Sequence, residues 1–326
     1  MLDNAVLFSL SANQDLAEKV AKILGVTLGE RIIKKFPSGE TIVEPVDTVR
    51  GKDVFIIQST CPPVNENLME VLIFIDALRR ASAHEINLIV PYFGYARQDR
   101  KAKPRQPITA ALVAHLLTTA GVDRVVTVNL HAAQEQGFFS CLVDDLTAVP
   151  LLGNDVIECA NNCENVTVVS PDHGGVNRAR DLAEMLDCPI AIIDKRRNNK
   201  LEPEVMNIIG EVKDRDCIMI DDMIDTCRSA IAGARALKAN GAKSVRMMAV
   251  HAVLSDPCYD LLKEDNPFDS IIVSDSIPLQ ERFKELGIFR VVTLSTVIAE
   301  TIDRIVNNVP LSGVYSAIGH KDSANS

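Results

Sequence analysis

The sequence predicts an α/β fold made of two similar parallel-sheet domains. Short β-branched runs alternate with amphipathic helical segments along the chain, the order expected of strands joined by right-handed crossover helices. The strand candidates are apolar at consecutive positions, which indicates strands covered on both faces and therefore parallel sheets. The length of 326 residues fits two domains of about 150 residues each.

Several segments fit this strand pattern because aliphatic and β-branched residues fill almost every position. They are 53–59, 86–91, 124–130, 166–171, 190–194, 217–221, 244–250 and 270–275. Ligands of open parallel sheets bind beyond the carboxyl ends of the strands. The residues that follow these segments are therefore the first candidates for a functional site.

Amphipathic periodicity predicts helices between the strands. The clearest segments are 13–24, 65–81, 109–120 and 228–239. Gly25 and Gly121 follow two of them directly and are expected C-caps, because glycine adopts the left-handed conformation without a Cβ penalty. Thr109 is the expected N-cap of the third helix.

A break in the alternation near 145–153 predicts the boundary between the domains. We expect an N-terminal domain over 1–148 and a C-terminal domain over 149–318. The polar residues 319–326 are expected to form a disordered tail.

Composition excludes some classes of protein. The net charge of −10 argues against nucleic-acid binding, which needs broad basic faces. No run of 18 apolar residues and no signal peptide is present, so we expect a cytoplasmic protein without a membrane span. The eight cysteines form no CxxC pair. We expect them to be reduced and mostly buried rather than bound to zinc.

The strongest chemical signal lies in residues 217–230. A strand pattern ends in Asp221 and Asp222, Asp225 and Thr226 follow, and a helix begins. Adjacent carboxylates can accept hydrogen bonds from a vicinal diol, and the amide groups and dipole of a helix N-terminus favour a phosphate. The pattern therefore indicates a phosphorylated ribose. The alternative is an acidic turn in which Thr226 or Ser229 only caps the helix.

Two cationic segments also follow strands. The first carries Arg97, Arg100, Lys101, Lys103 and Arg105, and the second spans 193–200 with the sequence IDKRRNNK. Arginine can stack on a base and bind phosphate oxygens in pairs, so the first segment is a candidate polyphosphate site. The second is a candidate flap that closes over phosphates. Without further context, each segment is more often an ordinary solvated loop.

His131 and Asp172 follow two further strand segments. Their spacing alone does not predict a metal site, because a single histidine is more often structural and magnesium prefers oxygen ligands.

Taken together, the chain resembles the ribose-phosphate pyrophosphokinase family from about residue 6 to 315. The segment 217–230 resembles the ribose-phosphate motif of the type I phosphoribosyltransferase fold, and further segments match that family in order. They are FPSGET (36–41), RGKDVFIIQST (50–60), PYFGYARQDRK (91–101), PITAALVA (107–114), NLHAAQEQGFF (129–139), SPDHGG (170–175), IDKRR (193–197), VMNIIGEV (205–212) and IDDMIDT (220–226). The resemblance implies two domains of this fold.

The resemblance also implies the reaction and the residues that carry it. ATP and ribose 5-phosphate would give AMP and 5-phosphoribosyl 1-pyrophosphate, with Mg²⁺ shared between the protein and the ATP phosphates. A nucleotide loop supplied by a neighbouring subunit implies a homo-oligomer, a hexamer in relatives. The implied roles are catalytic for Lys195 and Arg197, ATP-binding for Phe36, Ser38, Gly39, Glu40, Arg97 and Gln98, metal-binding for His131 and Asp172, and ribose 5-phosphate-binding for Asp221, Asp222, Asp225, Thr226, Cys227, Arg228 and Ser229.

Some positions depart from the family's pattern. Ser38, Asn129 and Ser140 stand where the family has aspartate, and the sugar-phosphate loop reads Asp-Thr-Cys-Arg-Ser over 225–229 instead of Asp-Thr-Ala/Gly-Gly-Thr. Glycine lets a loop approach phosphate closely and adopt positive φ, which Arg228 does less easily. Two interpretations follow: an active divergent enzyme, or a weakly active or inactive subunit that associates with an active relative. The retained residues favour activity.

A third class is a phosphoribosyltransferase that consumes the pyrophosphorylated sugar. That class explains the motif in residues 217–230 but assigns no function to residues 91–101 and 129–139. The ending VPLSGVY matches the family's regulatory ending only in part, so the sequence does not predict control by phosphate.

Overall fold

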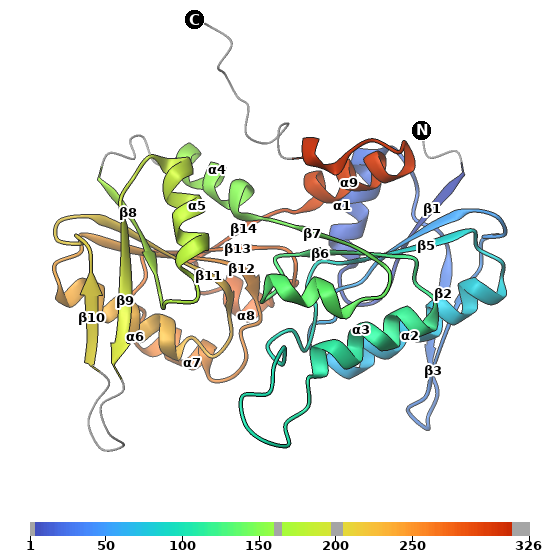
Figure 1. Ribbon diagram of the computed structural model, residues 1–326, viewed down its shortest axis with the longest axis horizontal. Helices are drawn as coiled ribbons and strands as arrows, with labels where there is room; N and C mark the ends of the chain where they lie inside the picture. Colours follow the sequence, from blue (N-terminus) through green and yellow to red (C-terminus); the bar gives the residue numbers. More distant parts are fainter. Residues whose placement is uncertain (1–3, 160–164, 197–204, 315–326) are drawn as a thin grey trace, which may run out of the picture. The chain divides into compact units, whose positions relative to one another are not determined.

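The computed structural model describes residues 4–159, 165–196 and 205–314 and confirms an α/β fold with parallel sheets (Figure 1). The described residues form two compact units. Unit 1 comprises 4–147, 276–278 and 293–314, and unit 2 comprises the described part of 148–275 together with 279–292. The domain boundary after residue 148 stays a prediction, and 319–326 lie outside the described residues.

Unit 1 is built on a five-stranded, all-parallel sheet of order β1-β4-β5-β6-β7. A separate antiparallel hairpin, β2-β3, lies outside this sheet, and β3 packs against α2. The strands are β1 (Ala5–Ser9), β2 (Arg31–Lys35), β3 (Thr41–Pro45), β4 (Asp53–Ile57), β5 (Glu85–Val90), β6 (Arg124–Val128) and β7 (Leu142–Leu146).

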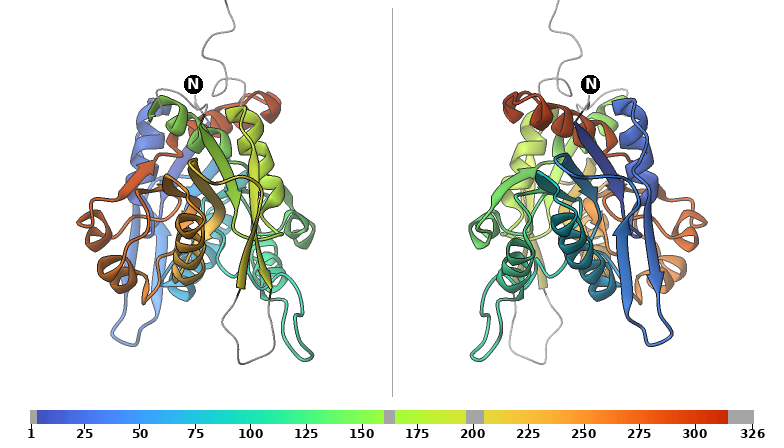
Figure 2. Two further views of the ribbon diagram at one scale, coloured as in Figure 1. Left: turned by 90° about the vertical axis from the view of Figure 1, so that its left-hand side faces the viewer. Right: turned by 90° about the vertical axis from the view of Figure 1, so that its right-hand side faces the viewer.

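The helices of unit 1 pack in pairs, α1 against α9 and α2 against α3 (Figure 2). They are α1 (Gln14–Leu24), α2 (Val64–Arg80), α3 (Thr109–Ala120), α9 (Ser295–Val306) and the 3-10 segments η1 (Ala133–Phe138) and η2 (Leu311–Gly313). Gly25 and Gly121 are confirmed as left-handed C-caps, with φ of 68° and 110°. The prediction for Thr109 is wrong: Ile108 is the N-cap, and the Thr109 hydroxyl instead donates to the side-chain oxygen of Gln98.

The core of unit 1 explains why its central strands are mostly apolar. Val54 to Ile57 of β4 and Ile86 to Val90 of β5 are all buried, because helices cover both faces of a parallel sheet. Phe8 of β1 and Phe74 of α2 meet edge to face, with ring centroids 5.2 Å apart.

Unit 2 carries a seven-stranded sheet of order β10-β9-β8-β11-β12-β13-β14, in which only β10 runs antiparallel to its neighbour. Its strands are β8 (Val166–Ser170), β9 (Ile190–Arg196), β10 (Val205–Ile209), β11 (Asp216–Ile224), β12 (Ser244–Ala252), β13 (Ser270–Ser274) and β14 (Phe289–Val292). Its helices are α4 (Val149–Cys159), α5 (Val176–Leu186), α6 (Arg228–Ala239), α7 (Cys258–Glu264) and α8 (Glu281–Lys284).

One expectation about the cysteines is wrong. Cys227 and Cys258, which are 31 residues apart in sequence, form a disulfide with their Cα atoms 5.1 Å apart. They meet because β11 and β12 are parallel neighbours, so the segments that follow these strands emerge at the same edge of the sheet. Cys61, Cys141, Cys188 and Cys217 are thiols.

None of the helices in the described ranges combines the length and hydropathy required to cross a membrane.

Candidate functional site

The predicted acidic pair lies within β11, which continues beyond the predicted strand end as far as Ile224. Arg178 of α5 binds both carboxylates: its Nη1 atom is 3.1 Å from Oδ1 of Asp221 and 3.8 Å from Oδ1 of Asp222. The backbone N–H of Asp222 also donates to Oδ1 of Asp221, at 2.8 Å. The two carboxylates therefore form one partly buried cluster with a single guanidinium.

Burial disfavours the state of this cluster in which both carboxyl groups are ionised. The Asp222 side chain is 7% exposed and that of Asp221 is 32% exposed. Burial and the neighbouring carboxyl of Asp222 raise the pKa of Asp221 to about 7, and Arg178 opposes this rise. The protonated form of the Asp221 carboxyl can donate a hydrogen bond as well as accept one.

The predicted sugar-phosphate loop, residues 225–229, follows directly on β11. Cys227 is the N-cap of α6 with a φ of 62°, and its carbonyl accepts the first helical hydrogen bond, from Ile231 at 2.8 Å. The structure gives Cys227 no side-chain cap. The first amide groups of a helix have no partner within the helix, so Arg228 and Ser229 present amides of the kind that bind anions. The alternative of a cap by Thr226 or Ser229 is not seen.

Asp172 lies at a second helix N-terminus in unit 2. It follows β8, and its Oδ1 atom accepts the N–H of Gly175, the N-cap of α5, at 3.0 Å. The hydroxyl of Ser170 donates to the Asp172 carbonyl at 2.6 Å. Asp172 itself is exposed, so the loop orients its carboxylate while leaving the side chain open to solvent.

The ATP candidates of unit 1 at positions 36–40 form the tip of the β2-β3 hairpin. The N–H of Phe36 donates to the Glu40 carbonyl, and Gly39 closes the turn with a φ of 90°, a conformation that favours glycine. Ser38 donates its hydroxyl to the Glu40 carboxylate at 2.8 Å. The Phe36 ring is 42% exposed, with the Lys34 ammonium 6.0 Å from its centroid. The tip thus presents an aromatic face and an oriented carboxylate.

Arg97 and Gln98 lie in the loop after β5, and both are exposed. This loop is fixed at Gly94, whose N–H donates to the Thr60 hydroxyl at 2.6 Å. A Cβ atom at Gly94 would lie 2.4 Å from the Thr60 carbonyl oxygen. The Gln98 N–H donates to the Tyr95 carbonyl at 2.8 Å. The Gln98 side-chain oxygen accepts from Thr109, which leaves its amide group as the part that can donate to a ligand.

His131 lies after β6 and is exposed. Glu135 closes the turn behind it: the N–H of Ala132 donates to Oε1 of Glu135 at 2.8 Å. Glu135 is fully buried, and burial raises its pKa to about 7 against a smaller opposing effect of His131. Asn129 has a φ of 47°, a left-handed conformation that asparagine tolerates better than most residues. Sequence reasoning missed Glu135, which reads as one more polar residue of a loop.

Asp172 offers the oxygen donor that magnesium prefers, whereas the imidazole of His131 suits softer divalent ions better. His131 belongs to unit 1 and Asp172 to unit 2, and each side chain is exposed. No group of three or more His, Cys, Asp or Glu side chains within the described ranges could hold a metal by itself. Magnesium bound together with substrate phosphates needs only one or two protein ligands and keeps several waters.

The predicted catalytic pair is described only in part. Lys195 is a backbone position of β9, paired with Met206 of β10. Arg197 lies outside the described residues. Arg178 is the functional candidate that sequence reasoning missed. Its signal was an arginine in the first turn of the helix that follows SPDHGG.

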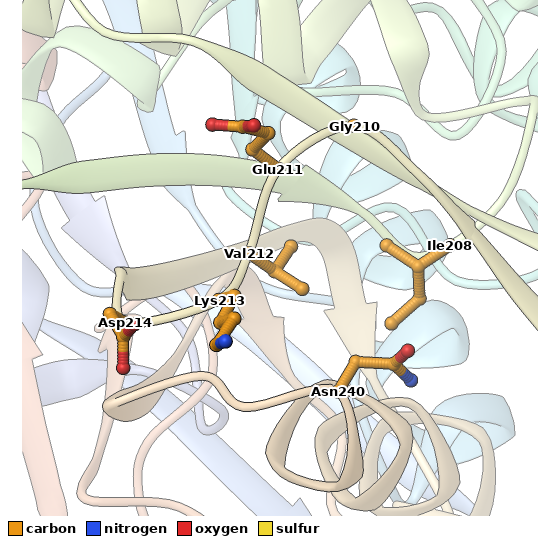
Figure 3. A pocket seen from close by; sticks show the side chains of 7 residues that line it. All are labelled: Ile208, Gly210, Glu211, Val212, Lys213, Asp214 and Asn240. Carbon is orange, nitrogen blue, oxygen red and sulfur yellow. The ribbon is translucent and has the colours of Figure 1, made fainter.

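A separate cavity of about 420 Å³ lies in unit 2, away from these residues (Figure 3). Ile208 of β10 and Asn240 after α6 face it. Its remaining lining residues are Gly210, Glu211, Val212, Lys213 and Asp214. These residues precede β11, so the cavity lies at the amino end of that strand, whereas Asp221 and Asp222 lie toward its carboxyl end.

Comparisons with known proteins cover both units. Residues 5–121 match the family described as the N-terminal domain of ribose phosphate pyrophosphokinase, and residues 196–316 match the phosphoribosyl synthetase-associated domain. A ribose-phosphate pyrophosphokinase of Fusobacterium nucleatum is 52% identical over 314 residues, which cover 96% of this chain and 99% of the relative. One from Campylobacter jejuni is 49% identical over 309 residues, covering 95% and 98%.

The same likeness holds in three dimensions. The crystal structure of phosphoribosylpyrophosphate synthetase from Mycobacterium smegmatis matches with a TM-score of 0.87 and 40% identity. The match covers 94% of this chain and 100% of that chain.

Proposed function

Because the chain belongs to the ribose-phosphate pyrophosphokinase family, we propose how its own residues carry out that family's reaction. The enzyme transfers the pyrophosphoryl group of ATP to the 1-hydroxyl of ribose 5-phosphate, giving 5-phosphoribosyl 1-pyrophosphate and AMP. The anomeric oxygen forms a bond to the β-phosphorus of ATP, and the bond from that phosphorus to the oxygen of the α-phosphate breaks. AMP leaves, and the hydroxyl proton passes to solvent.

The observation that carries the sugar assignment is an acidic pair followed by an uncapped helix N-terminus. Asp221 and Asp222 lie near the end of β11, and α6 begins at Arg228. The carboxylates accept hydrogen bonds from the 2- and 3-hydroxyls of the ribose. The loop 225–229 binds the 5-phosphate through its amide groups and the helix dipole. Arg178 is a positioning residue, because it neutralises and orients the two carboxylates that hold the diol.

The nucleotide side lies in unit 1. Phe36 stacks on the adenine, and Glu40, oriented by Ser38 and by the turn at Gly39, contacts the nucleotide. Arg97 binds phosphate oxygens, and Gln98 donates through its side-chain amide. An aromatic ring that is 42% exposed at a hairpin tip suits a residue that completes the site of another copy. We therefore propose a homo-oligomer, of six subunits as the family resemblance implies. We expect it to act in the cytoplasm, with ATP as its co-substrate.

Transfer of a phosphoryl-type group needs positioning and neutralisation of charge rather than covalent participation of the protein. His131 and Asp172 would hold Mg²⁺ together with the ATP phosphates, and the bound ion supplies Lewis-acid neutralisation of their oxygens. Lys195 and Arg197 are the proposed catalytic pair, which stabilises the negative charge that spreads over the transferred group.

The test is AMP release measured by chromatography, with ATP and MgCl₂ and with or without ribose 5-phosphate. We expect AMP only when the sugar is present, in equal amount with 5-phosphoribosyl 1-pyrophosphate. Asp222→Asn removes one carboxylate at nearly constant volume and should raise KM for ribose 5-phosphate at least tenfold. The matched control is Asp265→Asn, which alters an exposed pair with Arg235. Release of AMP without sugar, or equal activity of the two variants, would contradict the assignment.

A further inference from the structure

The disulfide lies at the sugar-phosphate loop itself. Cys227 is the middle residue of the loop 225–229 and the N-cap of α6, and Cys258 is the first residue of α7. Their Cα atoms are 5.1 Å apart, well inside the range that a disulfide spans. The bond therefore ties the segment that presents amides to a phosphate to the start of a neighbouring helix.

The crosslink is part of the core of unit 2. Cys227 is 4% exposed and Cys258 is 0% exposed. Both belong to the hydrophobic cluster that contains Ile224 and Leu254, and the Leu254 N–H donates to the Ile224 carbonyl at 3.0 Å. The two segments that carry the cysteines thus start from adjacent, hydrogen-bonded positions, and the disulfide is the covalent continuation of that contact.

Cys227 is also the loop residue with a left-handed backbone, at a φ of 62°. This conformation is energetically unfavourable for a non-glycine residue, so a loop without the crosslink tends to leave it. The disulfide from Cys227 to the buried first residue of α7 restricts this conformational change. Restricting a loop to its ligand-bound shape raises affinity by lowering the ordering cost of binding.

We propose that Cys227 and Cys258 form a thiol–disulfide switch that sets the affinity of the enzyme for ribose 5-phosphate. The inference rests on the proposed role of loop 225–229 in binding that sugar phosphate. In the disulfide form the loop is preorganised and KM for ribose 5-phosphate is low. In the dithiol form the loop is looser, and KM rises about three- to tenfold, since one ordered loop contact corresponds to about a tenfold change at most. The site for ATP lies in the other unit, so its KM stays constant.

The chemistry is an exchange with a low-molecular-weight disulfide such as oxidised glutathione. Two protein thiols and one such disulfide give the Cys227–Cys258 bond and two small thiols. The two electrons and the two protons of the protein thiols pass to the small molecule. Disulfides of cytosolic proteins are usually transient or redox-sensing, which suits a regulatory rather than a purely structural bond.

The first experiment measures the redox state directly. The full-length enzyme is equilibrated in glutathione buffers of graded ratio, alkylated, digested and analysed by mass spectrometry, with and without saturating ribose 5-phosphate. Linkage is reciprocal. Saturating ribose 5-phosphate should therefore shift the midpoint of oxidation toward more reducing glutathione ratios. The factor of the shift should equal the ratio of the affinities of the disulfide and dithiol forms for ribose 5-phosphate. An unshifted midpoint, or no disulfide at any ratio, overturns the switch.

The second experiment removes the crosslink without touching the sugar loop. Cys258→Ala should give the high KM for ribose 5-phosphate of the reduced enzyme in both redox conditions, with an unchanged KM for ATP. Cys141→Ala in unit 1 is the control and should keep the full response. A thermal melt verifies that each variant is folded. A Cys258→Ala enzyme that still responds to glutathione, or that keeps the low KM, overturns the proposal.

Equilibrium dialysis with radiolabelled ribose 5-phosphate separates the two levels of the argument. Equal binding to the oxidised and reduced enzyme would overturn the switch and leave the proposed function standing. No binding to either form would overturn both.

Discussion

Arg178 gives the sharpest test of the electrostatic argument. We consider Arg178→Met, which keeps the length of the side chain and removes its charge. At an effective dielectric constant of about 20, a charge at 3.1 Å is worth about 5 kcal/mol of Coulomb attraction to Asp221, and one at 3.8 Å about 4 kcal/mol to Asp222. Desolvation of the three groups offsets most of this attraction.

The net loss follows from burial. Breaking a fully buried pair costs about 3–5 kcal/mol, whereas an exposed pair contributes about 0–1 kcal/mol. Arg178 is 17% exposed and Asp222 7%, but Asp221 is 32% exposed and so partly screened. We therefore expect Arg178→Met to lower the free energy of unfolding by about 2 kcal/mol at pH 8.

The pH dependence has a definite sign. The folded-state pKa of Asp221, about 7, is above its ordinary value of 3.8, so the folded state binds a proton that the unfolded state has lost. Stability from this group is present below pH 4 and falls as pH rises through 7. Arg178 lowers this pKa, so its loss raises the pKa further. The variant's deficit should be larger at pH 8 than at pH 5.

The assay is urea denaturation at pH 5 and pH 8, followed by far-UV circular dichroism because the chain contains no Trp. Arg180→Met is the matched control. Arg180 is on the same helix and exposed, and its guanidinium donates to the side-chain oxygen of Asn177 at 3.5 Å, so we expect a change within about 0.5 kcal/mol. Equal deficits at both pH values, or equal effects of the two substitutions, would refute the reasoning.

Three further predictions concern unit 1. Between pH 4.5 and pH 7 the wild type should lose about 3 kcal/mol of stability, because burial raises the pKa of Glu135 from 4.5 to about 7. Glu135→Gln should remove this loss. The prediction is contradicted if the denaturation midpoint changes between pH 5 and pH 8 by the same amount in both proteins. Gly94→Ala should destabilise the protein by about 1–3 kcal/mol and raise KM for ATP, because its Cβ would lie 2.4 Å from the Thr60 carbonyl oxygen; wild-type thermal stability would show that the loop yields. Ser38→Ala should raise KM for ATP about twofold to fivefold by releasing the Glu40 carboxylate, and steady-state kinetics with an unchanged KM would separate Ser38 from the nucleotide site.

The sequence predicted the central strands because burial on both faces leaves an unmistakable record. Every predicted strand is present, and each lies in the interior of a sheet. The six unpredicted strands are different in kind. Four of them, β1, β7, β10 and β14, form sheet edges, and β2 and β3 form a two-stranded hairpin. An edge strand is covered on fewer sides, as in the partly exposed LVDDL of β7, so its residues need not be uniformly apolar.

Local sequence patterns could not predict the tertiary contacts between distant segments. The arginine that neutralises Asp221 comes from α5, 43 residues earlier in the chain, and nothing in its own neighbourhood marks it as a partner of β11. The Cys227–Cys258 bond likewise depends on β11 and β12 being neighbours. The candidate residues for ATP, ribose 5-phosphate, magnesium and catalysis stay predictions, since the family pattern and not a bound ligand assigns their roles.

The departure at Arg228 illustrates how the structure changes an inference from sequence. The loss of glycine at 228 suggested a loop unable to adopt positive φ next to the phosphate. In the structure the left-handed residue is Cys227, with a φ of 62°, and Arg228 is the first residue of α6. A helical position accepts any ordinary side chain without backbone strain, and the Arg228 side chain is exposed. The left-handed position of this loop is therefore Cys227, the residue that the disulfide holds, and not position 228. The backbone at position 228 therefore needs no glycine, and the substitution at 228 gives no ground for expecting an inactive enzyme.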